Sequence, residues 1–153
     1  MYIGQVKEKT MNQSPLSNIK SPHHDVKLME PFDIIKAEVA HNKDIGFTDK
    51  ELYAGLITIC EKPEFRILRE NNTLLVLHNQ GGGLAEIYLI TADKPAVFSH
   101  NFKEFGHALR VGGFKHLKYY TNRRAMIRVL KQLSDKITET QLSTGQYLVE
   151  IDL

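Results

Sequence analysis

The sequence has few of the residues that mark several protein classes. Its 153 residues include one cysteine, Cys60, and no tryptophan. A lone cysteine cannot form an internal disulfide or a cysteine-based zinc site. We therefore expect Cys60 to be a small, buried, apolar side chain on a helix, as free cysteines usually are. The formal net charge is only +2, so bulk charge alone indicates neither a nucleic-acid nor a membrane partner.

Long hydrophobic runs are also absent. No stretch of the sequence approaches the roughly 18 apolar residues that a membrane-spanning helix requires. The first 25 residues lack the apolar segment of about 7–15 residues that is typical of a secretory signal. We therefore expect a soluble, intracellular protein without a membrane partner.

The length indicates one domain preceded by a polar arm. A chain of about 150 residues is typical of a single domain. Residues 1–24 are polar, contain two Ser-Pro pairs and show little hydrophobic periodicity. Such a segment buries too little apolar surface to offset its ordering entropy. We predict an extended arm over 1–24 and a folded domain over 25–153.

Hydrophobic periodicity predicts an alternating α/β pattern. Thr48 and Glu51 form a capping-box pattern at the start of one helix, and Ser99 is the expected N-cap of another. The predicted helices cover 31–42, 48–62, 99–111 and 122–133. The predicted strands cover 24–29 (weakly), 65–70, 73–78, 84–90, 114–121, 135–142 and 146–153.

Three consecutive glycines lie in the stretch "HNQGGGLAEIYLI", residues 78–90. A phosphate-binding loop needs such glycines between a strand and a helix N-terminus, where free N–H groups face the anion. Here another strand-like run follows Gly83, and no Gly-Lys-Ser/Thr follows. The glycines therefore predict a turn between two strands. We expect any anion site later, between Ile90 and Ser99.

The order of elements resembles the GNAT (Gcn5-related N-acetyltransferase) superfamily. The likeness is carried by "AEIYLITADKPAVFSHNFKEFGHAL" (85–109), by the segment 117–153, and by an Asn-x-x-Ala step at Asn122 and Ala125. The chain is more narrowly similar to small GNAT-like proteins of short-tailed bacteriophages, some of them linked with virion assembly. The resemblance implies an α/β (α+β) fold with a mixed, largely antiparallel sheet flanked by about four helices.

The resemblance also implies positions for acetyl-CoA and for catalysis. Glu86 would be the general base for an amine, or else a solvated carboxylate on an edge strand. Alternation from Leu84 puts Glu86, Tyr88 and Ile90 on one face of that strand. Tyr119 and Tyr120 would supply a proton, one facing the core and the other a cleft, unless both are only core or surface residues. The implied cofactor-binding residues are Leu89, Ile90 and Thr91 for pantetheine, Ser99, His100 and Asn101 for pyrophosphate, and Arg123 and Arg124 beside Asn122 for the 3′-phosphate.

Three departures from the family pattern favour loss of the chemistry. The segment 91–101 lacks the Arg/Gln-x-x-Gly-x-Gly/Ala pattern, and Pro95 removes a backbone N–H. Val129 stands where these enzymes often place a proton-donating tyrosine. Leu133-Ser134 stand where the family usually ends that helix with Gly-Phe. We therefore expect a catalytically degenerate GNAT-fold protein, a bacteriophage virion structural or assembly component located in the virion or the host cytoplasm. The alternative is an acetyl-CoA-dependent N-acetyltransferase acting on an amine.

The remaining charged and imidazole groups indicate partners rather than metals. The seven histidines are scattered without a completing carboxylate or cysteine cluster, so we expect no metal site. Between Ser99 and Leu133 the sequence has one acidic residue, Glu104, and eight basic residues. The basic residues are Lys103, Arg110, Lys115, Lys118, Arg123, Arg124, Arg128 and Lys131. This excess is either a solvated helix face or a basic surface for CoA phosphates, nucleic acid or an acidic protein. Without an aromatic platform or a helix-turn-helix, sequence-specific nucleic-acid binding is not expected. Protein partners are expected through the arm and this basic face.

Overall fold

The computed structural model describes residues 26–42, 45–131 and 134–153. The described helices are α3 (Pro31–His41), α4 (Asp49–Cys60), α5 (Pro95–Val111) and α6 (Arg124–Leu130). The described strands are β1 (Phe65–Glu70), β2 (Thr73–Gly81), β3 (Leu84–Thr91), β4 (His116–Thr121), β5 (Ile137–Gln141) and β6 (Tyr147–Asp152). The predicted arm over 1–24 lies outside the described residues.

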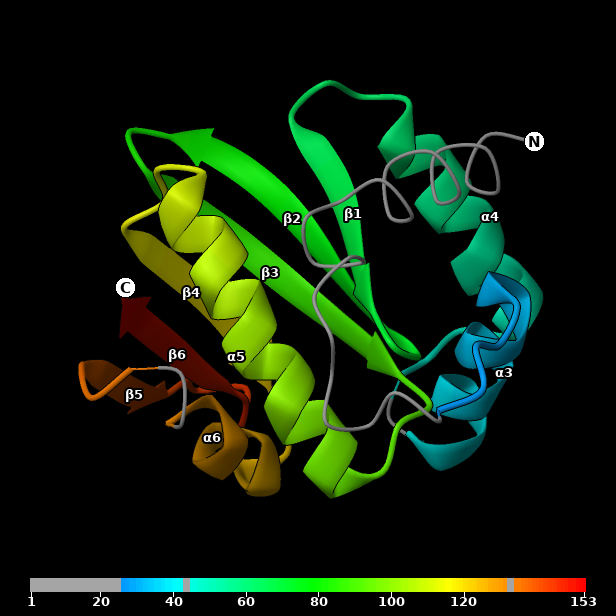
Figure 1. Cartoon of the computed structure of the whole chain (residues 1–153). Coiled ribbons are helices and arrows are strands. Elements are labelled where there is room, and N and C mark those ends of the chain that lie inside the picture. The colour runs from blue at the N-terminus through cyan, green and yellow to red at the C-terminus, as the bar shows by residue number, and fades with distance from the viewer. Residues whose placement is uncertain (1–25, 43–44, 132–133) are drawn as a thin grey trace.

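The six described strands form one sheet in the order β1-β2-β3-β4-β6-β5. Every neighbouring pair is antiparallel except β3 and β4, which run parallel. Helix α5 makes the crossover between those two strands, because parallel strands cannot be joined by a tight turn. In Figure 1, α5 crosses in front of the sheet while α3 and α4 lie toward its β1 side. The predicted mixed, largely antiparallel sheet with four helices is confirmed for the described residues.

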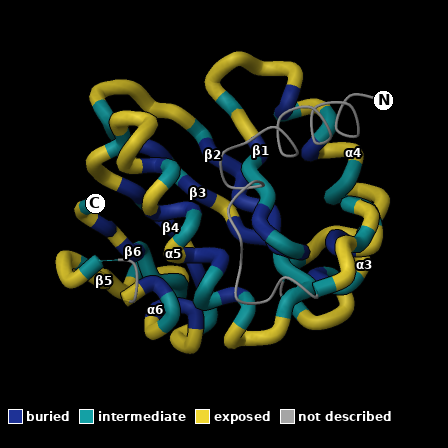
Figure 2. Tube along the Cα trace, in the orientation of Figure 1, coloured by how far each residue is buried: buried dark blue, intermediate teal, exposed yellow. Residues whose placement is uncertain are grey.

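The sheet separates two hydrophobic cores, since alternate residues of a strand point to opposite faces. On β3, Ala85, Ile87 and Leu89 belong to the core under α5 and α6. Ile90, next along the strand, belongs to the core under α3 and α4, together with the predicted buried Cys60. Figure 2 shows the resulting buried strands at the centre and exposed segments around them. This alternation fixes which β3 side chains can reach which surface.

Local sequence signals explain several element boundaries. Thr48 and Glu51 form the predicted capping box, in which each side chain accepts a hydrogen bond from the other residue's backbone N–H. The three-glycine stretch is the predicted turn between strands: Gly81, Gly82 and Gly83 have φ angles of 87°, 63° and 82°. Side-chain-bearing residues rarely adopt such angles. The glycines therefore serve the β2–β3 hairpin rather than a phosphate.

Two predicted helix starts and one predicted strand are wrong. Helix α5 begins at Pro95 with Lys94 as N-cap, so Ser99 is not the N-cap; the fixed φ of proline suits a first helical position. Helix α6 begins at Arg124 with Arg123 at its N-cap, two residues after the predicted start at 122. Residues 26–29 form no strand. None of the described helices combines the length and apolar character needed to cross a membrane.

Helix α5 is held on the sheet by an aromatic stripe that its sequence spacing predicts. Phe98, Phe102, Phe105 and Leu109 recur at helical spacing and are all buried. Phe98 and Phe102 also meet edge to face, with ring centroids 5.6 Å apart. Because α5 joins β3 to β4, this stripe also fixes the relative position of those two strands.

Truncation of this stripe tests its contribution to stability. The side chain of Phe105 is fully buried, so Phe105→Ala should lower the free energy of unfolding by about 3–5 kcal/mol through lost burial and a residual cavity. Urea denaturation followed by circular dichroism measures the change. Val111, which is 76% exposed at the end of the same helix, gives the matched control. Val111→Ala should change the free energy by less than about 0.5 kcal/mol. Equal losses in both variants would contradict the assignment of Phe105 to the core.

Candidate functional site

Strands β3 and β4 pair over only part of their length. Their parallel register covers Leu84–Glu86 on β3 and His116–Lys118 on β4. Beyond these positions β3 continues to Thr91 and β4 to Thr121. The two strands therefore diverge after Glu86, and β3 has no β4 partner from Ile87 onward. We call this feature the β3–β4 split.

Polar and aromatic side chains gather at the start of the β3–β4 split. Glu86, Tyr88 and Ile90 share the sheet face of α3 and α4, as their predicted alternation requires. The Glu86 carboxylate accepts hydrogen bonds from the Tyr88 hydroxyl and, over 3.2 Å, from Gln80 Nε2. Tyr88 is 44% exposed and Tyr120, across on β4, is 38% exposed. The predicted general base thus lies beside two accessible phenols, one of which, Tyr88, the sequence did not single out.

Burial and the neighbouring carboxylate determine the protonation of this tyrosine. Burial, the hydrogen bond to Glu86 and the charge of Glu86 raise the pKa of Tyr88 to about 12. The Tyr88 phenol is therefore protonated at neutral pH and donates to the carboxylate. A carboxylate that already accepts two hydrogen bonds is oriented, and it keeps lone pairs for a third donor such as an amine.

The two predicted proton-donating tyrosines lie on opposite faces of β4. Tyr119 is buried in the core under α5 and α6, and burial raises the pKa of its phenol against the lowering effect of the nearby Arg123. Tyr120 faces the same side as Glu86 and is exposed. The structure thus has one of the two tyrosines facing the core, while the cleft expected beside the other stays a prediction. Of the two, only Tyr120 can meet a substrate on the Glu86 face.

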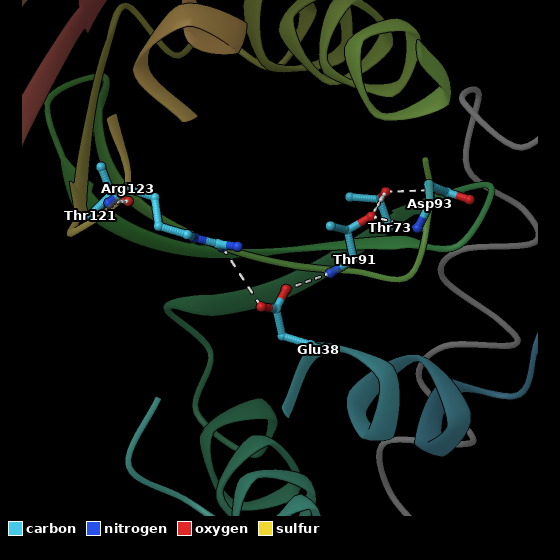
Figure 3. A network of polar contacts seen from close by, with 6 residues as sticks. All are labelled: Glu38, Thr73, Thr91, Asp93, Thr121 and Arg123. Atoms are coloured by element: carbon cyan, nitrogen blue, oxygen red, sulfur yellow. Dashed lines mark hydrogen bonds and ion pairs between the residues drawn. The ribbon is translucent and has the colours of Figure 1, made fainter. Parts of the chain in front are cut away.

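A buried carboxylate lies across the open end of the β3–β4 split (Figure 3). Glu38 of α3 is 2% exposed. Its Oε1 accepts a hydrogen bond of 3.0 Å from the backbone N–H of Thr91, and its Oε2 lies 3.7 Å from Arg123 Nη2. One carboxylate thereby connects α3, the end of β3 and the N-cap of α6. In the sequence, Glu38 is a charged residue at the helical spacing of the apolar residues Ile34 and Ile35. This was the signal that could have identified it as a buried, functional carboxylate.

The three residues of the expected pantetheine edge are largely engaged within the protein. The side chains of Leu89 and Ile90 are buried, one in each core. The Thr91 N–H donates to Glu38, and the Thr91 hydroxyl lies 2.7 Å from the Thr73 hydroxyl. A pantetheine amide acceptor at Thr91 would have to displace Glu38.

A second carboxylate, Asp93, fills the polar region before α5. Asp93 Oδ2 accepts hydrogen bonds from the Asn72 N–H at 2.8 Å, the Thr73 hydroxyl at 2.9 Å and Asn101 Nδ2 at 2.8 Å. Figure 3 shows Thr73, Thr91 and Asp93 together at the end of β3. Asn101 is fully buried in this network. It ties α5 to the β1–β2 turn, since its Oδ1 also accepts from Asn71 Nδ2.

The residues expected to bind pyrophosphate therefore do not lie at a helix N-terminus. Ser99, His100 and Asn101 follow the Pro95 start of α5 by about one turn. At that depth the backbone N–H groups belong to the helix ladder, so they do not form an anion site. Ser99, His100 and Asn101 therefore lack the free N–H groups of a helix N-terminus, which were the reason for expecting a pyrophosphate at these residues.

The expected 3′-phosphate residues point to different partners. Asn122 is exposed, and Arg123 contacts Glu38. Arg124 donates a hydrogen bond of 3.0 Å to the Tyr147 hydroxyl, lies 5.1 Å from the Tyr147 ring centroid and is 3.5 Å from Glu139. The two arginines are not brought together in this arrangement. Within the described ranges, no three His, Cys, Asp or Glu residues form a group that could hold a metal ion.

Comparison with known proteins identifies the fold. No protein-family model and no curated protein sequence matches the chain. The structure of a domain from Methanocaldococcus jannaschii DSM 2661 matches with a TM-score of 0.58 at 12% identity, covering 83% of this chain and 96% of that chain. The acetyltransferase (GNAT family) from Bacillus anthracis matches with a TM-score of 0.54 at 10% identity, covering 82% and 92%. The chain has the GNAT fold, as predicted. At such identities the likeness is one of fold alone, and the narrower similarity to bacteriophage proteins stays a prediction.

Glu70, which is buried at the end of β1, should make the free energy of unfolding depend on pH. Burial, with the charges of Glu104 and Asp93 adding to it, raises the pKa of Glu70 from 4.5 to about 7. Between these two pH values the folded protein binds more protons than the unfolded chain, so its free energy of unfolding falls as pH rises through this window. The total loss should reach up to about 3 kcal/mol.

Denaturation across the same pH window tests this effect. Glu70→Gln cannot ionise, so it should remove the fall and be more stable than the wild type at about pH 8. Glu64→Gln, at an exposed position just before β1, is the control and should keep the wild-type slope. An unchanged slope in Glu70→Gln would show that Glu70 is not the group responsible.

Proposed function

We propose that the protein is an N-acyltransferase that moves an acyl group from a CoA thioester to an amine. The observation that carries this proposal is the β3–β4 split with Glu86 at its start. In a sheet, two strands that diverge leave backbone groups that an extended ligand can pair with. The GNAT-family acetyltransferase from Bacillus anthracis, which shares the fold, supports the acyl-transfer chemistry.

The Glu86 face supplies the groups that the reaction needs. The Glu86 carboxylate takes a proton from the ammonium or amine acceptor, and Tyr88 holds that carboxylate in place. The amine nitrogen attacks the thioester carbonyl directly, the carbon–sulfur bond breaks, and an amide forms. The thiolate of CoA leaves and takes a proton, for which the proposed donor is the exposed Tyr120 hydroxyl. Acetyl-CoA is the proposed cofactor, with its pantetheine along Leu89, Ile90 and Thr91, where it would displace Glu38 from the Thr91 N–H.

Replacement of the proposed base separates catalysis from binding. Glu86→Gln keeps the side-chain shape and its hydrogen-bonding oxygen but cannot take a proton, so kcat should fall about 10²–10⁴-fold. The KM for acetyl-CoA should change little, because Glu86 does not touch the thioester in this scheme. Acetyl transfer to a panel of amines, followed by release of the CoA thiol, measures both quantities.

Glu150 provides the matched control for this variant. Glu150 lies on β6 opposite Lys118 of β4, on the same sheet face as Glu86, and is exposed. Glu150→Gln should retain activity within about twofold. Equal losses of kcat in both variants would argue for a general electrostatic effect of the face and against a specific base.

A second candidate function is a GNAT-fold binding protein that has lost acyl transfer. Two internal carboxylates favour this function. Glu38 accepts the hydrogen bond of the Thr91 N–H, and Asp93 accepts hydrogen bonds from the polar groups before α5. Negative charge at both positions would repel a pyrophosphate. Val129 offers no proton where a tyrosine was expected. A role in bacteriophage assembly, with protein partners, remains the prediction made from the resemblance.

Titration of acetyl-CoA into the wild type and Glu38→Ala distinguishes the two candidates. If Glu38 blocks the site, the wild type should show no heat of binding at millimolar ligand. Glu38→Ala should then bind, because the Thr91 N–H and Arg123 are released. Asp33→Ala, at an exposed position on the same helix, controls for the loss of one negative charge. Micromolar binding to the wild type that Glu38→Ala leaves unchanged would contradict the blocking role and favour the enzyme.

A further inference from the structure

The outer surface of α5 and α6 carries exposed charges of one sign. The exposed charged residues of these two helices and their flanking caps are all basic: Lys94, Lys103, Arg110, Arg124, Arg128 and Lys131. The one acidic residue in the two helices, Glu104, is only partly exposed and lies close enough to Glu70 to influence its charge. We call this surface the α5–α6 basic face.

The spacing of these residues aligns them in two stripes. Lys103, His107 and Arg110 follow one another at i, i+4 and i+7 along α5. Arg124, Arg128 and Lys131 repeat the same spacing along α6. Residues at these intervals lie on one side of a helix, and each stripe spans about 10 Å at 1.5 Å per residue. Both helices lie on the same side of the sheet, packed over the same core (Figure 1).

The opposite helical layer does not share this charge pattern. The exposed charges of α3 and α4 are mixed, with Asp33 and Glu51 beside Lys36 and Lys50. The net charge of the whole chain is only +2. The positive potential is therefore concentrated on one face of the molecule, which is the arrangement that attracts a polyanion from solution.

Several of these cations are available for an external partner. Within the described part of the chain, Lys103, Arg128 and Lys131 take part in no ion pair. Arg124 is partly neutralised by Glu139, 3.5 Å away. At least three separate positive charges therefore remain for contact with an anionic surface.

The apolar content of the face indicates the class of partner. The central part of a protein–protein interface is usually apolar and depleted in charge. Among the described residues of α5 and α6, Val111 at the end of α5 is the one large hydrophobic side chain that is exposed. A nucleic-acid backbone needs no apolar centre, because phosphate contacts supply its affinity. Charge complementarity fits either kind of anionic partner, but the lack of an apolar centre favours nucleic acid over an acidic protein.

We propose that the α5–α6 basic face binds the phosphodiester backbone of nucleic acid without sequence preference. The contacts are charge-assisted hydrogen bonds from lysine and arginine side chains to phosphate oxygens. The face lies on the sheet side opposite Glu86, so this binding does not depend on the proposed acyl transfer. Phosphate contacts fix the protein on the backbone and carry no sequence information.

Fluorescence anisotropy with a labelled duplex of about 20 base pairs tests the proposal, with salt varied from about 50 to about 200 mM. The wild type should bind at low salt, and the logarithm of its association constant should fall linearly with the logarithm of salt concentration. The triple variant Lys103→Ala, Arg128→Ala, Lys131→Ala should bind at least tenfold more weakly at low salt. Its slope should be shallower by about 2–3, since each lost phosphate contact removes roughly 0.9.

A matched triple variant removes the same charge from the other helical layer. Lys36→Ala, Lys50→Ala, Lys62→Ala changes three exposed lysines around α3 and α4 and should keep the wild-type affinity within about twofold, with the wild-type slope. Circular dichroism checks that both variants are folded. A duplex of unrelated sequence should bind the wild type equally well.

Several outcomes would overturn the proposal. One is the absence of binding by the wild type at the lowest salt. A second is an equal loss of affinity in both triple variants, which would mean that net charge alone is responsible. A third is poly-glutamate competing as well as unlabelled duplex at equal charge, which would point to an acidic protein instead. A strong preference for one duplex over the other would contradict backbone binding.

Discussion

The short parallel contact between β3 and β4 is the constraint on which the rest of the molecule depends. It covers three residue pairs, Leu84–Glu86 with His116–Lys118, and it joins the β1–β2–β3 meander to the β4–β6–β5 unit. A parallel pair needs a long crossover, which here is α5 with its buried phenylalanines. Because the contact is short, the strands separate beyond it, and a sheet that is otherwise continuous acquires an opening in its middle. The face at this opening carries Glu86, Tyr88 and Tyr120.

Glu38 lies across that opening and contacts residues on both sides of it. A buried carboxylate is costly unless it is paired and hydrogen-bonded, and Glu38 meets both conditions through Thr91 and Arg123. One of these contacts satisfies the N–H of Thr91, which lies beyond the three β3 residues that pair with β4. Under the proposed function, an extended ligand would compete with Glu38 for this N–H.

The fold was largely predictable from local signals, whereas the site was predictable only in part. Alternation along β3 placed Glu86 and Tyr88 on one face, and the glycines at 81–83 gave the hairpin, because both depend on neighbouring residues alone. The predicted start of α5 at Ser99 is wrong because Pro95, which suits the first helical position, begins the helix; this proline is an equally local signal. The contact of Glu38 with Thr91 spans 53 residues. No periodicity encodes a contact of that range, and so the position of Glu38 across the open end of the β3–β4 split emerges only from the tertiary structure.

The two faces of the sheet differ in the kind of chemistry they can support. On the α3–α4 side, an oriented carboxylate and two phenols act over single hydrogen bonds, so their effect depends on precise position and is little affected by salt. On the α5–α6 side, separate cations on exposed helices act through summed charge, which tolerates imprecise geometry and weakens as salt rises. The sheet lies between the two faces and has an apolar core packed on each side. A ligand on one face therefore cannot touch a group on the other. Arg123 offers one physical link between the faces, because this N-cap residue of α6 contacts Glu38 at the β3–β4 split while its neighbour Arg124 begins the basic stripe.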